Sequence, residues 1–252
     1  MSTQNFLRIL PAALLTAALA HAANVTVTYA DENVMQQKVV SATRYFEQVW
    51  AQIFASRGAR YASPQIVAYT NSIKTACGVM GKDNAFYCEG DKRIYYDIVF
   101  LTGMMKAAGA YLGTDGDYAP ITVLAHEWGH AVQDQLDSAS LIGLFRENMA
   151  DCLAGAITQR AGADHYLDQG DLEEARYALA MGGDKPGTTW VLSPQAHGSS
   201  QTRVNEFMKG YKGGVNACQV FQTSRLKDGG DPAALAIRTM TEMMQGLAKT
   251  GQ

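Results

Sequence analysis

Clustered positive charge is what this sequence most clearly lacks. Charged residues make up 18% of the chain, the formal net charge is −3, and no basic cluster is longer than the pair Lys92-Arg93. Nucleic-acid binders concentrate Lys and Arg on one face, so the composition argues against DNA or RNA as a partner. Low-complexity tracts and internal repeats are also absent, and 47% of the residues are hydrophobic. We therefore expect a globular enzyme or binding domain with its own core.

Long apolar runs are missing after the N-terminus. Arg8 precedes an apolar run at residues 9–20, and residues 20–22 read AHA, an A-x-A cleavage site. This predicts a signal peptide at 1–22 and a single domain at 23–252. Removing the peptide takes away Arg8 and no acidic residue, so the formal net charge changes from −3 to −4. The alternative is an uncleaved N-terminal membrane anchor, although the run is short for a bilayer span. Either way we expect an exported protein, periplasmic or secreted, with no membrane span in the mature chain.

The cysteines lack the C-x-x-C pairs that a cysteine-rich zinc site would need. In an exported chain, four cysteines are most simply two disulfides. Of the three pairings that four cysteines allow, we favour Cys77 with Cys88, which closes a short loop, and Cys152 with Cys218. The second bond would tie the helix that carries Asp151 to the C-terminal region.

Hydrophobic periodicity predicts an α+β fold that is mainly helical with a small mixed or antiparallel sheet. Strands are expected at 64–70, 85–88 and 93–96, with 89–92 connecting the last two as a hairpin. A Gly- and Pro-rich stretch at 182–200 predicts a surface loop. Helices are expected at 31–56, 98–110, 120–136, 141–160, 172–180, 200–212 and 232–249.

The residues that suggest chemistry begin with HEWGH at 126–130. This is an H-E-x-x-H pattern in a helical segment, so His126 and His130 lie on one face and can bind one zinc ion. Glu127 lies about 100° around the helix, where its carboxylate can act as a general base without becoming a ligand. The alternative is a helix with surface polar residues, but the apolar residues around the histidines indicate a buried stripe.

A catalytic zinc ion needs a third protein ligand and an open position. The extended form H-E-x-x-H-x-x-G-x-x-H is excluded, because Gln133 and Leu136 occupy its last two defined positions. The apolar helix that follows carries Glu147 and Asp151 on one face, where unpaired carboxylates would be costly to bury. We therefore expect Glu147 as the third ligand and Asp151 as the acceptor for a ring N–H of either histidine. The alternative is a solvated helix face.

Several of these motifs together resemble the bacterial family of neutral zinc metallopeptidases. HEWGH followed by ENMADCLAG at 147–155 is similar to the family's HEYGHHVQ-type and ELQADCxAG-type segments. HGSSQTRV at 197–204 is similar to its HGTSxQRV stretch, and the likeness extends to FYC at 86–88 with YYD at 95–97. It covers roughly residues 77–221.

The resemblance implies a zincin fold of the gluzincin kind, with a helix that carries the H-E-x-x-H motif. Glu147 matches the family's third-ligand position, and Asp151 matches the acid that supports the zinc site. The sequence departs from the family pattern where ENM replaces ELQ and where Trp128 stands at a position often held by Tyr. These departures leave the metal chemistry unchanged and bear on substrate preference.

These residues predict a zinc-dependent peptidase with one Zn²⁺ per chain and a peptide or protein substrate, in which Glu127 is the general base. His197 is a candidate donor to the tetrahedral oxyanion, with Tyr95 or Tyr96 behind it; its alternative is a loop residue or a helix N-cap contact. A different class of function, a noncatalytic zinc-stabilised envelope scaffold, has no use for a base beside the metal. A peptidoglycan or ester hydrolase would use the same chemistry. The sequence leaves the cleavage preference and the oligomeric state open.

Overall fold

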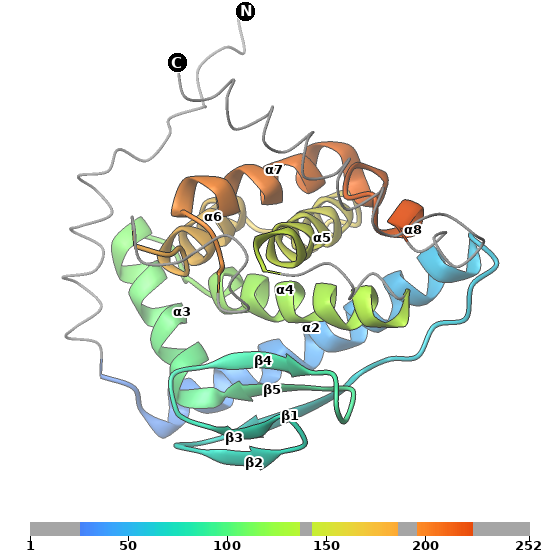
Figure 1. The fold of residues 1–252 in the computed structure, drawn as a ribbon. Coiled ribbons are helices and arrows are strands. Elements are labelled where there is room, and N and C mark those ends of the chain that lie inside the picture. The colour runs from blue at the N-terminus through green and yellow to red at the C-terminus, as the bar shows by residue number, and fades with distance from the viewer. Residues whose placement is uncertain (1–25, 137–142, 186–195, 224–252) are drawn as a thin grey trace, which may run out of the picture.

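The computed structural model describes residues 26–136, 143–185 and 196–223 (Figure 1). Within them, no helix combines the length and hydrophobicity needed to cross a bilayer. The strands are β1 (Gln65–Tyr69), β2 (Ile73–Thr75), β3 (Gly78–Met80), β4 (Ala85–Cys88) and β5 (Arg93–Asp97). The helices are α2 (Tyr29–Ala55), α3 (Ile98–Leu112), α4 (Tyr118–Gln135), α5 (Leu144–Ala163), α6 (Asp171–Met181), α7 (Ser200–Ala217) and the short α8 (Val220–Thr223).

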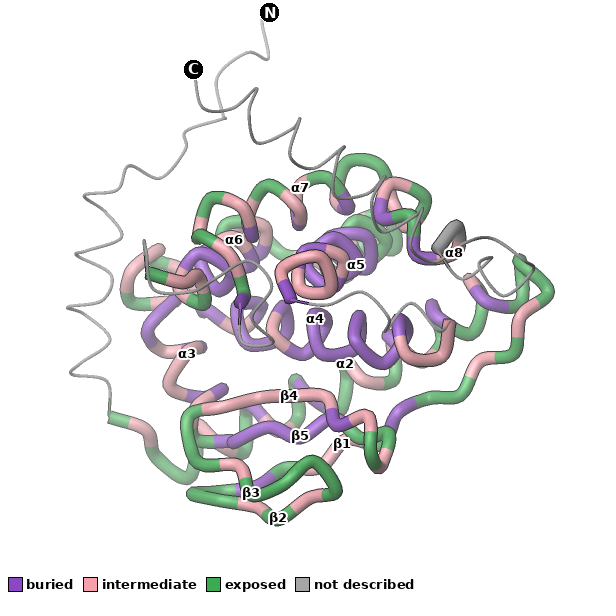
Figure 2. Tube along the Cα trace, viewed as in Figure 1, coloured by how far each residue is buried: buried purple, intermediate pink, exposed green. Residues whose placement is uncertain are grey.

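The small sheet is mixed, and α4 lies directly against it. Its strand order is β1-β5-β4, with β1 parallel and β4 antiparallel to β5, while β2 and β3 form a separate antiparallel pair. Figure 1 shows α4 between β4 on one side and α5 on the other. Because it is covered from both sides, α4 is buried along most of its length, whereas β2 and β3 contain no buried residue (Figure 2).

The first turn of α4 is capped from another helix. Asp117 makes no side-chain capping bond at this N-terminus. Instead, the two carboxylate oxygens of Glu174 in α6 accept hydrogen bonds from the backbone N–H groups of Gly116 and Tyr118, at 3.1 and 2.7 Å. The bond to Tyr118 satisfies a donor that a helix start otherwise leaves unpaired, and the bond to Gly116 holds the residue before the N-cap.

Two glycines allow α5 and α7 to cross almost in backbone contact. A Cβ at Gly155 would lie 1.9 Å from the carbonyl oxygen of Phe207, and one at Gly210 would lie 1.8 Å from that of Cys152. A real Cβ cannot occupy either place, so the crossing requires glycine on both helices. One turn before Gly155 on α5 and two turns before Gly210 on α7, Asp151 and Arg203 meet.

The expected elements agree with the structure except where segments are short or outside the described residues. The sheet is mixed, and the predicted hairpin forms between β4 and β5. The β2–β3 pair and α8 were not predicted, because each strand has only three residues and α8 four. The helix expected to end at residue 212 continues to Ala217 past Gly214, whose φ of 63° interrupts it. The signal peptide at 1–22 and the helix at 232–249 lie outside the described residues.

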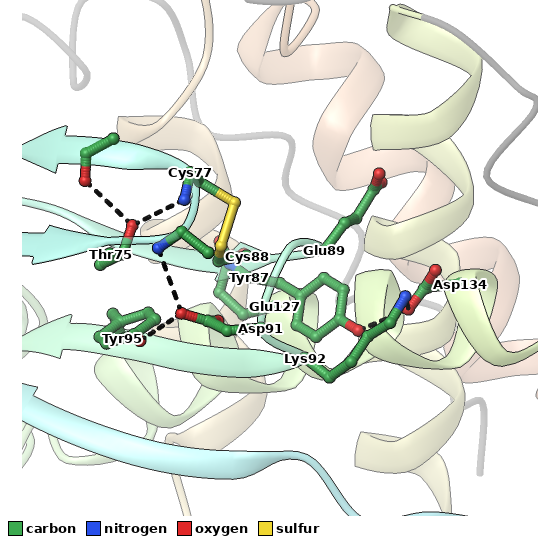
Figure 3. The surroundings of a disulfide bond; sticks show 12 residues. Thr75, Cys77, Tyr87, Cys88, Glu89, Asp91, Lys92, Tyr95, Glu127 and Asp134 are labelled. Carbon is green, nitrogen blue, oxygen red and sulfur yellow. Dashed lines mark hydrogen bonds and ion pairs between the residues drawn. A yellow bond between two sulfur atoms is a disulfide. The ribbon is translucent and has the colours of Figure 1, made fainter.

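Two disulfides are formed, Cys77–Cys88 and Cys152–Cys218, and these are the pairings that the sequence favours. The first joins the β2–β3 turn to the end of β4 (Figure 3). The second joins α5 to the residue that follows α7. The described residues contain no free cysteine. Disulfides of this kind are typical of proteins outside the cytoplasm.

Removing the Cys152–Cys218 bond should lower stability more than removing Cys77–Cys88. The bonds span 66 and 11 residues respectively. Restricting the unfolded chain over these lengths corresponds to about 4 and about 3 kcal/mol. Urea unfolding of the two Cys→Ala double variants, compared with the parent under non-reducing conditions, measures this. An unchanged midpoint for Cys152→Ala/Cys218→Ala would contradict the expectation.

Candidate metal centre

Three side chains of the site come from α4. His126 and His130 are one helical turn apart, so their rings share a face and their Nε2 atoms lie 3.1 Å from each other. Glu127 points towards β4 instead, where its carboxylate meets the backbone of Tyr87. All three side chains are buried, with relative exposures of 4, 6 and 7% for His126, His130 and Glu127. Polar groups at this depth need partners.

α5 brings a carboxylate to the two imidazoles. Oε2 of Glu147 lies 3.1 Å from Nε2 of His126, and its Oε1 lies 3.3 Å from Nε2 of His130. The helices come this close because Gly129 has no side chain: a Cβ there would lie 3.0 Å from Cα of Ala150. The structure thus brings together the three residues that the sequence predicts as metal ligands.

The other nitrogen of each imidazole meets a buried acceptor. Nδ1 of His126 lies 2.7 Å from Oδ1 of Asp151, and Nδ1 of His130 lies 2.8 Å from Oε1 of Gln133. Gln133 presents its oxygen to the ring because its Nε2 donates to the carbonyl oxygen of Arg146, at 2.8 Å. These contacts hold a proton on Nδ1 of each ring and turn Nε2 of each ring towards Glu147.

The donor atoms are spaced as zinc ligands are. Tetrahedral ligands about 2.0 to 2.1 Å from one ion lie about 3.3 Å from each other. The three distances here are 3.1, 3.1 and 3.3 Å. Oε2 of Glu147 is buried and has no hydrogen-bond partner among the described residues. Two imidazoles and one carboxylate that converge on a point fit a catalytic zinc ion, and within the described residues this group has three members.

Arg203 from α7 compensates the charge of Asp151. Asp151 is fully buried, and Arg203 donates to it from Nε at 2.9 Å and from Nη2 at 2.7 Å. A third bond, from Nη1 to the carbonyl oxygen of Gly182 at 3.1 Å, holds the guanidinium in place. Burial opposes ionisation of Asp151, but Arg203 and His126 together outweigh burial and hold the pKa of Asp151 below its usual value.

The electrostatic environment of the candidate ligands favours the binding of a cation. Burial lowers the pKa of His126, but the carboxylates of Asp151 and Glu147 together outweigh burial and raise the pKa to about 10. Burial raises the pKa of Glu147, but the imidazoles of His130 and His126 outweigh it and hold the pKa far below its usual range. A site that attracts a proton this strongly also attracts a divalent ion, whose binding releases that proton.

The β4–β5 hairpin holds Glu127 from the side opposite α5. Oε2 of Glu127 accepts a hydrogen bond from the backbone N–H of Tyr87 at 2.8 Å. The Tyr87 hydroxyl and Nζ of Lys92 each lie 2.6 Å from Oδ2 of Asp134, which fastens the hairpin to the end of α4 (Figure 3). One oxygen of Glu127 is therefore held by the hairpin.

A cavity of about 580 Å³ opens beside Glu127. Its lining includes His126, Glu127, His197 and Arg203, together with side chains of α3 and α6. Binding pockets for small molecules commonly have volumes of this size. A bound molecule in this cavity would reach the carboxylate of Glu127 and one candidate metal ligand.

His197 lines this cavity, and the tyrosines expected behind it do not. The side chain of His197 is 47% exposed. The Tyr95 and Tyr96 hydroxyls donate instead to the side chains of Asp91 and Gln36. The expected position of either tyrosine behind His197 is therefore corrected, and the role of His197 as an oxyanion donor stays a prediction.

A second group of carboxylates near the start of α4 has a structural explanation. Asp115, Asp117, Asp171 and Glu174 lie close together. Asp117 pairs with Lys38, and Glu174 caps α4. Oδ2 of Asp171 accepts the backbone N–H of residue 168, and burial raises the pKa of Asp171 to about 7. These bonds assign the cluster to the junction between α4 and α6.

Three contacts of the centre were not predicted. Gln133 lies three residues after His130, on the same face of the helix, and this spacing was the available signal. Arg203 lies within the HGSSQTRV stretch but had no partner assigned from sequence. The N–H of Tyr87 belongs to the backbone, so no residue type could have indicated it.

Comparison with known proteins agrees with the geometry. No solved structure matches this chain. The uncharacterized protein YpfJ of Escherichia coli strain K12 is 33% identical over 219 residues, which cover 77% of this chain and 73% of YpfJ. The uncharacterized protein Rv2575 of Mycobacterium tuberculosis is 29% identical over 227 residues, covering 79% and 75%. The model of the family described as "Putative neutral zinc metallopeptidase" matches residues 15–149 and 137–221, and the chain therefore belongs to that family.

Proposed function

We propose that this protein is a zinc-dependent peptidase whose single zinc ion is bound by His126, His130 and Glu147. The observation that carries the proposal is the triangle of donor atoms, 3.1 to 3.3 Å on each side, beside a buried glutamate at a cavity. The family description, which names a zinc metallopeptidase, supports the same metal and reaction class.

Glu127 is the general base in this proposal. A bound zinc ion lowers the pKa of water from about 15.7 to about 7 and polarises a carbonyl group. Glu127 accepts the proton of the attacking water and passes it to the leaving amine, so that one peptide bond and one water molecule give a carboxylate and an amine. The hydrogen bond from the N–H of Tyr87 orients the carboxylate for this transfer.

His197 is the proposed donor to the oxyanion of the tetrahedral intermediate. It lines the same cavity as Glu127. Its backbone N–H and that of Gly198 both donate to Oδ2 of Asp184, at 2.9 Å each. This anchors the backbone at residues 197–198. Nδ1 of the imidazole lies 3.7 Å from Oδ1 of Asp184, so Nε2 is the atom proposed to donate to the oxyanion.

We also infer a single zincin-like metallopeptidase domain at 23–252, preceded by a signal peptide at 1–22. The two disulfides support export, periplasmic or secreted, because such bonds persist in oxidising compartments. Peptides or proteins outside the cytoplasm are therefore the proposed substrates.

A noncatalytic zinc-stabilised scaffold would share the ligands but not the rest of the site. A structural zinc site closes its fourth position with a protein ligand. Within the described part of the chain, the ligand group has three members. The adjacent buried base and the cavity have no purpose in a scaffold, and they favour catalysis.

Zinc analysis combined with a peptide-library digest tests the proposal. Purified protein should contain about one zinc per chain and should cleave peptides, and a chelator should remove both the metal and the activity. Absence of stoichiometric zinc would contradict the proposed centre. Stoichiometric zinc without cleavage of any peptide would favour the scaffold.

A further inference from the structure

The cavity beside Glu127 extends between α3 and α6, where its walls are apolar. Met104, Val123 and Tyr177 belong to one hydrophobic cluster and line it together. Val99 also lines it and remains 39% exposed. Apolar surface of this kind is left for a bound group to cover. The wall residues with large apolar side chains include Val99, Phe100, Met104, Val123, Tyr177 and Leu179.

The same walls disfavour binding of a charged side chain. None of the lining residues contributed by α3 or α6 is charged. The charged lining residues are Asp83, Glu127 and Arg203, and each already has a partner: Asp83 pairs with Lys82 at 3.6 Å, Glu127 binds the N–H of Tyr87, and Arg203 binds Asp151. A charged side chain placed against α3 and α6 would lose its hydration without gaining a partner.

Gly103 keeps the α3 wall open. It lies inside a helix, where glycine is less favourable than alanine. Packing does not demand a glycine here: a Cβ at this position would have only one atom within 4 Å, Cγ2 of Val27 at 3.9 Å. A longer side chain would project into the cavity, so the glycine leaves volume beside the catalytic residues.

We infer that this cavity receives a large apolar side chain, aromatic or long aliphatic, from the substrate residue next to the scissile bond. The inference rests on the proposed peptidase function and names its substrate class: peptides cleaved beside Phe, Leu or Met. The observation behind the inference is that the apolar walls belong to the same cavity that Glu127 and His126 line. Its volume of about 580 Å³ is ample for such a side chain.

Amino-acid hydroxamates test the side-chain preference apart from turnover. Calorimetry should measure the binding of leucine, phenylalanine, glycine and aspartate hydroxamates to the zinc-loaded protein. Because the apolar side chains leave water, the leucine and phenylalanine probes should bind at least about 10-fold more tightly than the glycine probe. The aspartate probe should bind no more tightly than the glycine probe.

A matched pair of variants places the preference in this cavity. Gly103→Leu should reduce the advantage of the leucine and phenylalanine probes to less than about 2-fold while zinc content and Tm are kept, because position 103 has room for a Cβ. Ala110→Leu adds a leucine to an exposed position of α3 that does not line the cavity. It should leave the preference as in the parent.

The outcomes separate this inference from the proposed function. Equal binding of all four probes, no binding of any, or a preference that survives in Gly103→Leu would overturn the cavity assignment. Zinc-dependent cleavage without preference for apolar residues would also overturn it, while leaving the peptidase proposal intact. A preference for leucine hydroxamate that Gly103→Leu removes, without cleavage of any peptide, would refute the peptidase and keep the ligand class.

Discussion

Glu127→Gln is expected to lower peptide hydrolysis by roughly 10²- to 10⁴-fold while zinc content and folding match the parent. The amide oxygen of Gln can still accept the hydrogen bond from the N–H of Tyr87, so the local structure should persist. What is lost is the group that accepts the proton of water. Measurements of kcat at saturating zinc, with zinc analysis of the same sample, record both quantities.

Asp151→Asn should differ from Glu127→Gln, because it should weaken zinc binding and leave residual activity. It keeps the size of the side chain but removes the charge that binds His126 and Arg203. Zinc affinity should fall by about 10- to 100-fold, with residual activity at saturating zinc. If Glu127→Gln cleaves peptides as fast as the parent with zinc bound, the assigned base is wrong.

Glu147→Ala should abolish stoichiometric zinc binding. It removes one of three donors and the only carboxylate among them, so affinity should fall by more than the 10- to 100-fold expected of a supporting residue. Zinc that binds only the folded protein raises its apparent stability by about 4 kcal/mol at 1,000 times the Kd. The rise of Tm on adding zinc to the chelated protein should therefore disappear in this variant.

The control for this variant is Glu173→Ala, which removes an exposed glutamate from α6. It should keep both the zinc content and the rise of Tm on adding zinc. His126→Ala should behave like Glu147→Ala. Full zinc occupancy in both ligand variants would show that the metal lies elsewhere.

The parts of this molecule that sequence predicts well are those set by local spacing. The helix expected at 120–136 is observed at Tyr118–Gln135, because apolar residues at helical intervals define it. The same spacing places His126 and His130 on one face. Glu147 was predicted as a partner because a carboxylate inside an apolar helix needs a cation.

Contacts between distant segments could not be predicted in the same way. Arg203 reaches Asp151 across 52 positions, and the N–H of Tyr87 reaches Glu127 across 40. Such contacts depend on the distance between two elements. The periodicity of residues along one helix gives no information about that distance. The cavity likewise depends on the separation of α3 and α6, so its apolar walls became apparent only once both helices were in place.

The helix crossing at Gly155 changes how the segment ENMADCLAG should be understood. Glu147, Asp151 and Gly155 follow one another at intervals of four along a single stripe of α5, with Cys152 beside them. The first two meet α4, and the third meets the backbone of α7. Gly155, the last residue of this motif, is thus required by the close packing of α5 against α7 and is not one of the proposed metal-binding or catalytic residues. A motif search that requires this glycine therefore selects for a close helix crossing as well as for the candidate metal ligands. A distant relative whose helices cross at a greater distance would keep the residues of the metal centre without matching the full motif.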